Sequence, residues 1–123
     1  MAMPSYNCVL CHHNKIETLF HLLLECSFAQ ECWIHLGLYA DLQLDPYFIM
    51  TSFKTQLQVP FFMEIIIIMS WCIWMARNDL IFRGIPPTTQ GAITRFKSIF
   101  TLVLHRVKEA WKQSTVEWLE LLL

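Results

Sequence analysis

Apolar residues in the second half of the chain recur every three or four positions, which is the period of a helix that packs one face on a neighbour. From Thr89 onward they fall at Ile93, Phe96, Phe100, Val103, Val107 and Ala110. The preceding apolar stretch predicts another long helix from Pro60, a residue that fits the first helical position, to about Phe82. Gly84 is placed to end that helix. The four isoleucines at 65–68 also suit a strand, but their flanks are helical.

Shorter helices are predicted before residue 60 from capping patterns. The pattern N-x-x-E at 14–17 is typical of a capping box, and it predicts a helix over about 15–24. The pattern S-x-x-Q at 27–30 predicts a second helix over 28–36. Gly37 lies just past the end of this helix, where a left-handed residue is favoured.

Two further short helices complete the predicted set, one over about 47–55 and one opened by the pattern S-x-x-E at 114–117. The composition agrees with a helical chain, because 3 Gly and 5 Pro in 123 residues leave little turn material for a many-stranded sandwich. The hydrophobic share of 55% excludes intrinsic disorder. We therefore predict a small all-α domain.

The chain has few charges for its size. Charged residues make up 15% of it, against about 25% in an average soluble domain. A polar surface this thin predicts that apolar helices, around 65–74 and 111–123, meet a protein partner, a second copy or a membrane. The alternative is that the chain is a fragment whose covering domain is missing. The most apolar stretch, 59–76, contains Glu64, and its uninterrupted part is shorter than the roughly 20 residues of a bilayer span. We predict a buried core helix there.

The N-terminal part of the chain holds three cysteines and a histidine at metal-ligand spacing: Cys8, Cys11, His21 and Cys26. A C-x2-C pair places two thiolates on one tight turn, and a distant His and Cys complete the tetrahedral set that suits Zn²⁺. A site whose four positions are all occupied by protein is structural. The alternative is that Cys8 and Cys11 are ordinary buried or surface thiols and that His21 is a core histidine. His12 and His13 are competing donors, but closing the site through them would strain the turn.

The spacing between His21 and Cys26 requires a break in the helix. Five positions on a continuous α-helix rotate by about 140°, so both side chains cannot point at one metal from an unbroken helix. The capping pattern at 27–30 independently predicts a break between them. Cys32 lies inside the second predicted helix, and we predict that it and Cys72 are core thiols.

These residues and their neighbours form a series of short motifs in a fixed order. The chain reads C-V-L-C at 8–11, E-T at 17–18, H-L at 21–22, C-S-F-A at 26–29 and W at 33, followed by W-x2-W-x2-R-N at 71–78 and I-F at 81–82. In this order the motifs resemble the zinc-binding domain near the C-terminus of plant reverse-transcriptase-like proteins, which belong to non-LTR retroelements. The resemblance covers about residues 5–83. It implies that Cys8, Cys11, His21 and Cys26 are the zinc ligands.

The resemblance implies a retroelement-derived zinc module detached from its catalytic parts. The polymerase of such elements needs paired aspartates that hold two magnesium ions. This chain contains only Asp41, Asp45 and Asp79, none of them adjacent, and it has no cluster of carboxylates of the RNase H kind. We therefore expect no enzymatic activity.

Weak nucleic-acid binding is the role that the resemblance implies for the module. Residues 1–50 hold one lysine against five acidic residues, so the zinc end is a poor phosphate binder by itself. The basic residues gather near the C-terminus: Arg95, Lys97, Arg106, Lys108 and Lys112. We interpret them as a solvated helix face, with nucleic-acid contact as the alternative. Trp71, Trp74 and Arg77 have the spacing of a stacking platform, but we predict core packing in so apolar a helix.

The predicted architecture is an N-terminal Cys3His zinc knuckle at 1–38, packed on the two long helices of 39–123 in the same domain. No secretory signal is recognised, and five cysteines, an odd number, suit a reducing compartment, so we expect a cytoplasmic or nuclear protein. The first expected function is a non-enzymatic zinc-binding module with weak nucleic-acid binding. The alternative is a small regulatory or protein-interaction protein that acts through its apolar helices, with membrane association as a variant.

Overall fold

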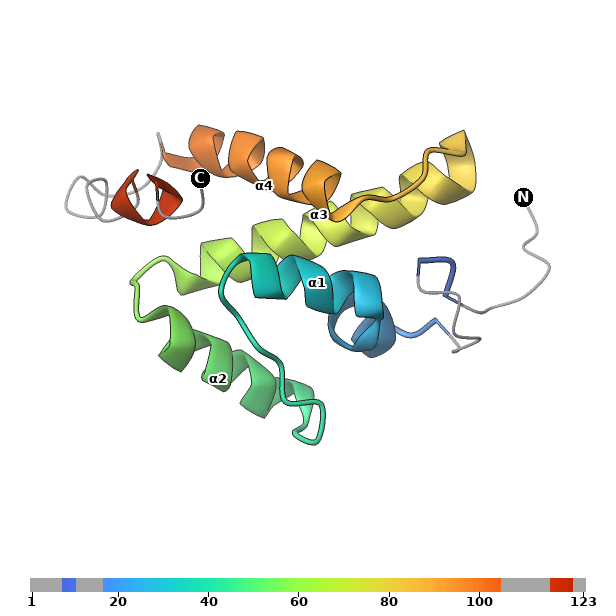
Figure 1. Ribbon diagram of the computed structural model, residues 1–123. Helices are drawn as coiled ribbons and strands as arrows, with labels where there is room; N and C mark the ends of the chain where they lie inside the picture. Colours follow the sequence, from blue (N-terminus) through green and yellow to red (C-terminus); the bar gives the residue numbers. More distant parts are fainter. Residues whose placement is uncertain (1–7, 11–16, 105–115, 121–123) are drawn as a thin grey trace.

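The computed structural model describes residues 8–10, 17–104 and 116–120, and every regular element in these ranges is helical (Figure 1). In chain order the elements are the π-helical turn η1 (His21–Glu25), α1 (Ser27–His35), α2 (Pro46–Leu57), α3 (Phe62–Arg83) and α4 (Thr89–Leu104). Residues 116–120 form one more helical segment. The prediction of an all-α fold is confirmed.

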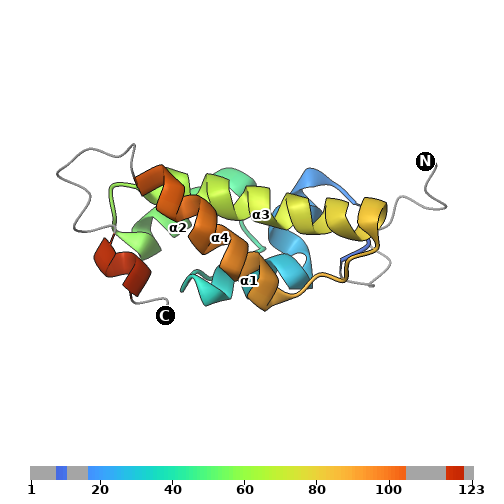
Figure 2. The ribbon, with the colours of Figure 1, turned by 90° about the horizontal axis from the view of Figure 1, so that it is seen from above.

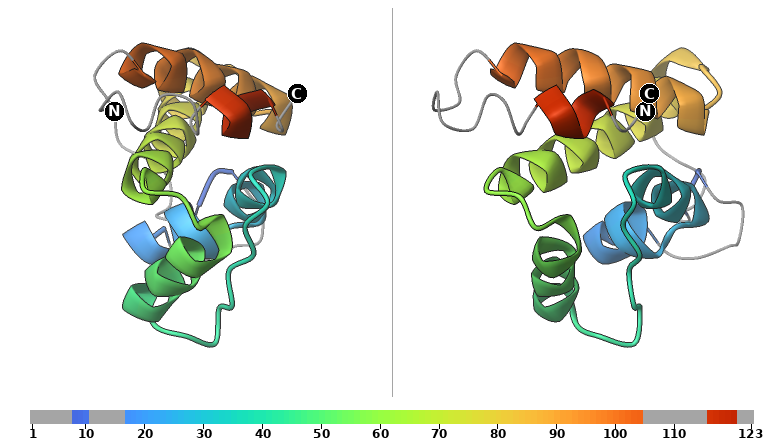
Figure 3. Two further views of the ribbon diagram at one scale, coloured as in Figure 1. Left: turned by 90° about the vertical axis from the view of Figure 1, so that its left-hand side faces the viewer. Right: turned by 60° about the vertical axis from the view of Figure 1, so that its left-hand side comes forward.

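The other helices are arranged around α3, which contacts η1, α1, α2 and α4. In Figure 1, α4 runs above α3, whereas α1 and α2 lie below it. Seen from above, α4 crosses α3 obliquely (Figure 2). The two views of Figure 3 show η1 and α1 side by side, and these two elements are in contact. The N-terminal part is thus held against both long helices.

Aromatic rings fill the core between the start of α3 and the middle of α4. Phe96 and Phe100 stack with their ring centroids 5.5 Å apart. Phe61, directly before α3, lies 5.9 Å from Phe100, measured between centroids. Trp118 meets all three rings edge-on. Because aromatic pairs at such distances add to the free energy of burial, this cluster fixes α4 on α3.

The predicted apolar seam of the last helix is confirmed where the structure describes it. Ile93, Phe96 and Phe100 are buried, and Val103 is half-buried. Positions 107 and 110 of the seam lie outside the described residues.

The prediction that two helices end at glycines is also confirmed. Gly37 has φ +80° and Gly84 has φ +65°, a region that residues with a side chain enter only at a cost. After α1, the Leu38 N–H donates to the Trp33 carbonyl at 2.9 Å and the Gly37 N–H donates to the Ile34 carbonyl at 2.9 Å. This pattern is a Schellman motif, which satisfies carbonyls that the helix end leaves open.

Several helix starts differ from the predictions. The capping box at Ser27 is wrong, because Cys26 is the N-cap residue and makes no side-chain capping bond. Gln30 Nε2 donates instead to the Glu25 carbonyl at 2.7 Å, which satisfies an acceptor of the preceding turn. The long helix α3 begins at Phe62, two residues after Pro60, which lies in a turn.

The first and third predicted helices are also shifted. Glu17 and Thr18 precede the first helical residues, and Thr18 Oγ1 accepts the His21 N–H at 3.0 Å, so the predicted start near residue 15 is wrong. The capping residue predicted for it, Asn14, lies outside the described residues, as does Ser114. The helix predicted over 47–55 is α2, and the carboxylate of Asp45 caps it by accepting from two backbone amides.

By length and composition alone, α3 would also suit a membrane crossing, with 33% of its most apolar 18-residue window buried. Six of its residues are buried against the rest of the described chain: Ile65, Ile66, Ile68, Met69, Cys72 and Ile73. These contacts support the prediction of a core helix for one face of α3.

Candidate metal centre

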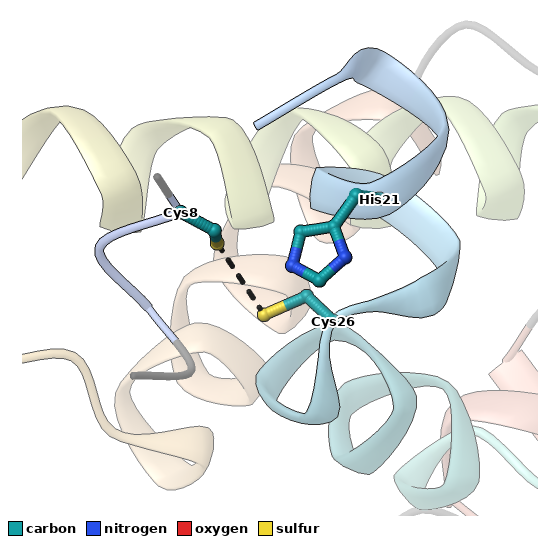
Figure 4. Close-up of side chains that lie close together, drawn as sticks. All are labelled: Cys8, His21 and Cys26. Atoms are coloured by element: carbon teal, nitrogen blue, oxygen red, sulfur yellow. Dashed lines mark hydrogen bonds between the residues drawn. The ribbon is translucent and has the colours of Figure 1, made fainter. Parts of the chain in front are cut away.

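Three of the four residues with metal-ligand spacing converge in the structure. Ligand atoms of Cys8, His21 and Cys26 all lie within 4.8 Å of one another, and all three residues are buried (Figure 4). The two sulfur atoms are 3.8 Å apart. A soft, desolvated donor set of this kind could hold a metal ion. Cys11, the fourth predicted ligand, lies outside the described residues, as do His12 and His13.

A wide backbone turn brings His21 and Cys26 to the same place. The Cys26 N–H donates to the His21 carbonyl at 2.6 Å, five residues back, which makes η1 a π-turn rather than an α-turn. Cys26 itself is extended, with ψ 135°, so the chain leaves the turn before α1 begins. The predicted break between His21 and Cys26 is confirmed, although the π-turn and not a cap at Ser27 produces it.

Two contacts hold the π-turn against its surroundings. The Trp33 indole N–H donates to the Leu23 carbonyl at 2.7 Å, which fastens α1 to the turn. His21 Nδ1 lies 2.9 Å from Glu25 Oε1. A carboxylate at this distance favours the tautomer with the proton on Nδ1, and in that neutral tautomer the other ring nitrogen presents its lone pair. In Figure 4 that second nitrogen faces the sulfur atoms of Cys8 and Cys26.

The two remaining cysteines that the structure describes lie outside this group of converging ligand atoms. Cys32 and Cys72 are fully buried, and burial raises the pKa of the Cys32 thiol to about 12 and that of Cys72 to about 11. The prediction that these two cysteines are core thiols is confirmed.

An ion pair connects the segment that precedes the π-turn to α3. Glu17 Oε1 accepts from both Nε and Nη2 of Arg77 at 2.8 Å, and the two side chains are only 16% and 15% exposed. Glu17 Oε2 is buried without a hydrogen-bond partner in the part of the chain that the structure describes. Arg77 also lies over the Trp74 ring, 4.8 Å from its centroid. This pair joins two motifs that are 60 residues apart in the sequence.

Sequence reasoning missed this ion pair. Both residues stand in the motifs at 17–18 and 71–78, but nothing in the spacing of either motif indicates the other as its partner. The prediction of core packing is also wrong for Trp71, which is 54% exposed, whereas Trp74 is half-buried. Trp71 faces outward because the buried side of α3 is the side of Cys72 and Ile73.

Only two of the five basic residues named for nucleic-acid contact are described. Arg95 Nη2 donates to Asp79 Oδ2 at 2.8 Å, and this hydrogen bond holds the pKa of the Asp79 carboxyl below its usual range. Lys97 is half-buried. Arg106, Lys108 and Lys112 lie outside the described residues. The guanidinium of Arg95 therefore joins α4 to α3, whereas a residue on a solvated helix face would contact only water.

No protein-family model, curated protein or solved structure matches this chain. The resemblance to the reverse-transcriptase zinc-binding domain therefore stays a prediction from the motifs. The geometry of Cys8, His21 and Cys26 supports a metal-binding group independently of that resemblance.

The Glu17–Arg77 ion pair is expected to couple the metal-site segment to α3. Glu17→Ala or Arg77→Ala should each lower the free energy of unfolding by about 2 to 4 kcal/mol, because each leaves a mostly buried charge unpaired. The double variant should lose little more than either single variant. Urea unfolding of all three measures this coupling. Arg83→Ala, which breaks an exposed pair with Asp79 at 3.5 Å, is the control and should change stability by about 0.5 kcal/mol or less. Fully additive effects at 17 and 77 would contradict the coupling.

Proposed function

We propose that this chain is a non-enzymatic zinc-binding module. In it, Cys8, Cys11, His21 and Cys26 bind a structural Zn²⁺ that fastens the N-terminal segment to the helices. The observation that carries the proposal is the convergence of two sulfur donors and one nitrogen donor in a buried position. Cys11 enters through its C-x2-C spacing from Cys8.

The distances of the described donors fit zinc. Four ligands at the corners of a tetrahedron with a Zn–S distance of about 2.3 Å place two sulfur atoms about 3.8 Å apart. The Cys8 and Cys26 sulfur atoms are separated by 3.8 Å. A disulfide would need about 2.05 Å, so this separation suits two thiolates on one ion better than a covalent bond. Thiolate and imidazole ligands together favour zinc over the oxygen-seeking cations Mg²⁺ and Ca²⁺.

Glu25 supports the same interpretation. A carboxylate on the far ring nitrogen fixes the tautomer and the orientation of a ligating histidine, and such partners are a regular feature of zinc sites. His21 has this arrangement through Nδ1 and Glu25 Oε1. When bound, zinc would supply folding free energy, and a set of four protein ligands leaves no open position for a substrate. This is the reason for proposing a structural role and no catalysis.

The origin of the module follows from the motifs. The resemblance to the zinc-binding domain of plant non-LTR retroelement proteins supports a retroelement-derived fragment. The buried thiols suit a reducing compartment, so we propose a cytoplasmic or nuclear protein.

We propose protein interaction as the second function, and weak nucleic-acid binding only as a residual property. The observation in favour of protein interaction is the outward face of α3, where Trp71 is exposed beside other apolar side chains. Phosphate binding depends on cations. Of the two described residues named for this role, Arg95 is engaged by Asp79 and Lys97 is half-buried.

Removing one ligand is expected to remove the metal. Cys26→Ser should lose most of the zinc that the purified wild-type chain carries, and its thermal unfolding should begin at lower temperature, because metal binding and folding share free energy. Elemental mass spectrometry measures the zinc content. Cys72→Ala, which changes a core thiol outside the cluster, is the matched control and should keep the zinc. Wild-type protein without zinc, or Cys26→Ser with a full complement, would contradict the proposal.

Nucleic-acid binding is expected to be weak and sensitive to salt. In a gel-shift titration with single-stranded RNA and DNA, wild-type protein should shift the probes only at low ionic strength and release them by about 0.2 M salt, because few cations contact phosphate. A complex that persists at that salt concentration would contradict protein interaction as the favoured second function.

A further inference from the structure

The outward face of α3 forms one wall of an apolar groove of 550 Å³. Its other wall comes from Leu19 and Leu23 around the π-turn and from Met50 of α2. Among the residues that the structure describes, the lining contains no charged residue, and Ser70 is its one polar member. Ile67 and Trp71 line it from α3, with 59% and 54% of their surface exposed. The groove is therefore apolar, open and made by three separate elements.

The residues of α3 along this groove have the spacing of a helix-packing seam. Met63, Ile67, Ser70 and Trp74 follow one another at intervals of four, three and four residues. That alternation is the pattern by which one helix meets another along its length. Since the opposite side of α3 is already buried, the helix is apolar on both sides, which is typical of a helix covered all round.

We infer that a second copy of this chain covers the groove, with the two α3 helices packed antiparallel about a two-fold axis between Ser70 and Trp71. A two-fold interface must be complementary to itself. Around Ser70, the small residue of the seam, large side chains stand on both sides, Ile67 before it and Trp71 and Trp74 after it. In an antiparallel pair Trp71 of one copy lies opposite Ser70 of the other, and Trp74 lies opposite Ile67. Large residues thus meet small or branched ones, as in packed helix pairs.

The helix dipoles favour the antiparallel direction. Antiparallel packing opposes the dipoles of the two α3 helices, whereas parallel packing would align them. Glu64 stands in the first turn of α3, and Arg83 stands in its last turn, where it is already paired with Asp79.

The exposed apolar area is sufficient for a stable dimer. The five large apolar side chains that are exposed along the groove are Leu19, Met50, Met63, Ile67 and Trp71. Together they present apolar area on the order of 500 Å². A standard interface buries about 800 Å² per partner, and about 65% of a homodimer interface is apolar, so the two quantities agree.

This inference rests on the interaction role proposed above and names its partner, and it does not depend on the identity of the metal. Sedimentation equilibrium of the purified full chain should show a dimer at micromolar concentration. Ile67→Glu should weaken the dimer at least tenfold, because it buries a charge at the seam. Ile34→Glu is the matched control, since Ile34 is 58% exposed on α1 outside the groove, and it should dimerise as the wild type does.

Three results would overturn the inference. These are a wild-type monomer at micromolar concentration, an Ile67→Glu dimer as tight as the wild type, and equal weakening by Ile34→Glu. A monomer that floats with phosphatidylcholine vesicles would assign the groove to a membrane instead. The zinc content of the same samples is measured separately, so failure of the dimer and failure of the metal proposal are distinguishable.

Cross-linking tests the direction of the helices. With a short bismaleimide, Ser70→Cys should give a covalent dimer above the wild-type background, because position 70 lies beside the two-fold axis. Met63→Cys should not, because antiparallel packing carries the two copies of residue 63 apart. Cross-linking of Met63→Cys as efficient as that of Ser70→Cys would overturn the antiparallel arrangement.

Discussion

Two thiols and one imidazole that converge away from water are the constraint on which the proposed role of the N-terminal part depends. Their ligand atoms lie within 4.8 Å of one another, and they come from two separate stretches of chain. Buried polar groups are stabilised by partners, and we propose that a shared cation is one partner of these three. The π-turn, the extended Cys26 and the Glu25 contact all serve to place these atoms. The Glu17–Arg77 ion pair then joins the segment before the π-turn to α3.

The local rules of helix formation made much of the fold predictable. Two features could be predicted because they are set by residues close together in the sequence. These are the helix ends at Gly37 and Gly84 and the apolar residues spaced three and four apart on α4. The spacing of His21 and Cys26 required a break in the helix, but it did not say which kind. An α-helical turn followed by a new N-cap would satisfy that requirement, and so would a single π-turn. Tertiary contacts such as the bond from Trp33 to the Leu23 carbonyl select the π-turn. The Glu17–Arg77 pair was beyond prediction because it joins positions 60 residues apart.

The exposure of Trp71 has a different reason. A helix that is apolar on every side gives no sign of which side its neighbours will cover, so periodicity could not distinguish the core face of α3 from its outward face. The structure makes that distinction. The dimer that we infer would account for the low charge content of the chain, because an apolar surface covered by a second copy needs fewer charged residues than a fully solvated one. The metal-binding group and the groove share the segment around the π-turn, since Leu19 and Leu23 flank His21.

X-ray absorption at the zinc edge tests the central claim most directly, because it reports the atoms bound to the metal. For the purified chain we predict a first shell of three sulfur atoms at about 2.3 Å and one nitrogen atom at about 2.0 Å. The shell should lose one sulfur in any Cys26→Ser protein that still retains metal. A chain that contains no zinc, or a zinc ion surrounded by oxygen and nitrogen atoms alone, would contradict the account.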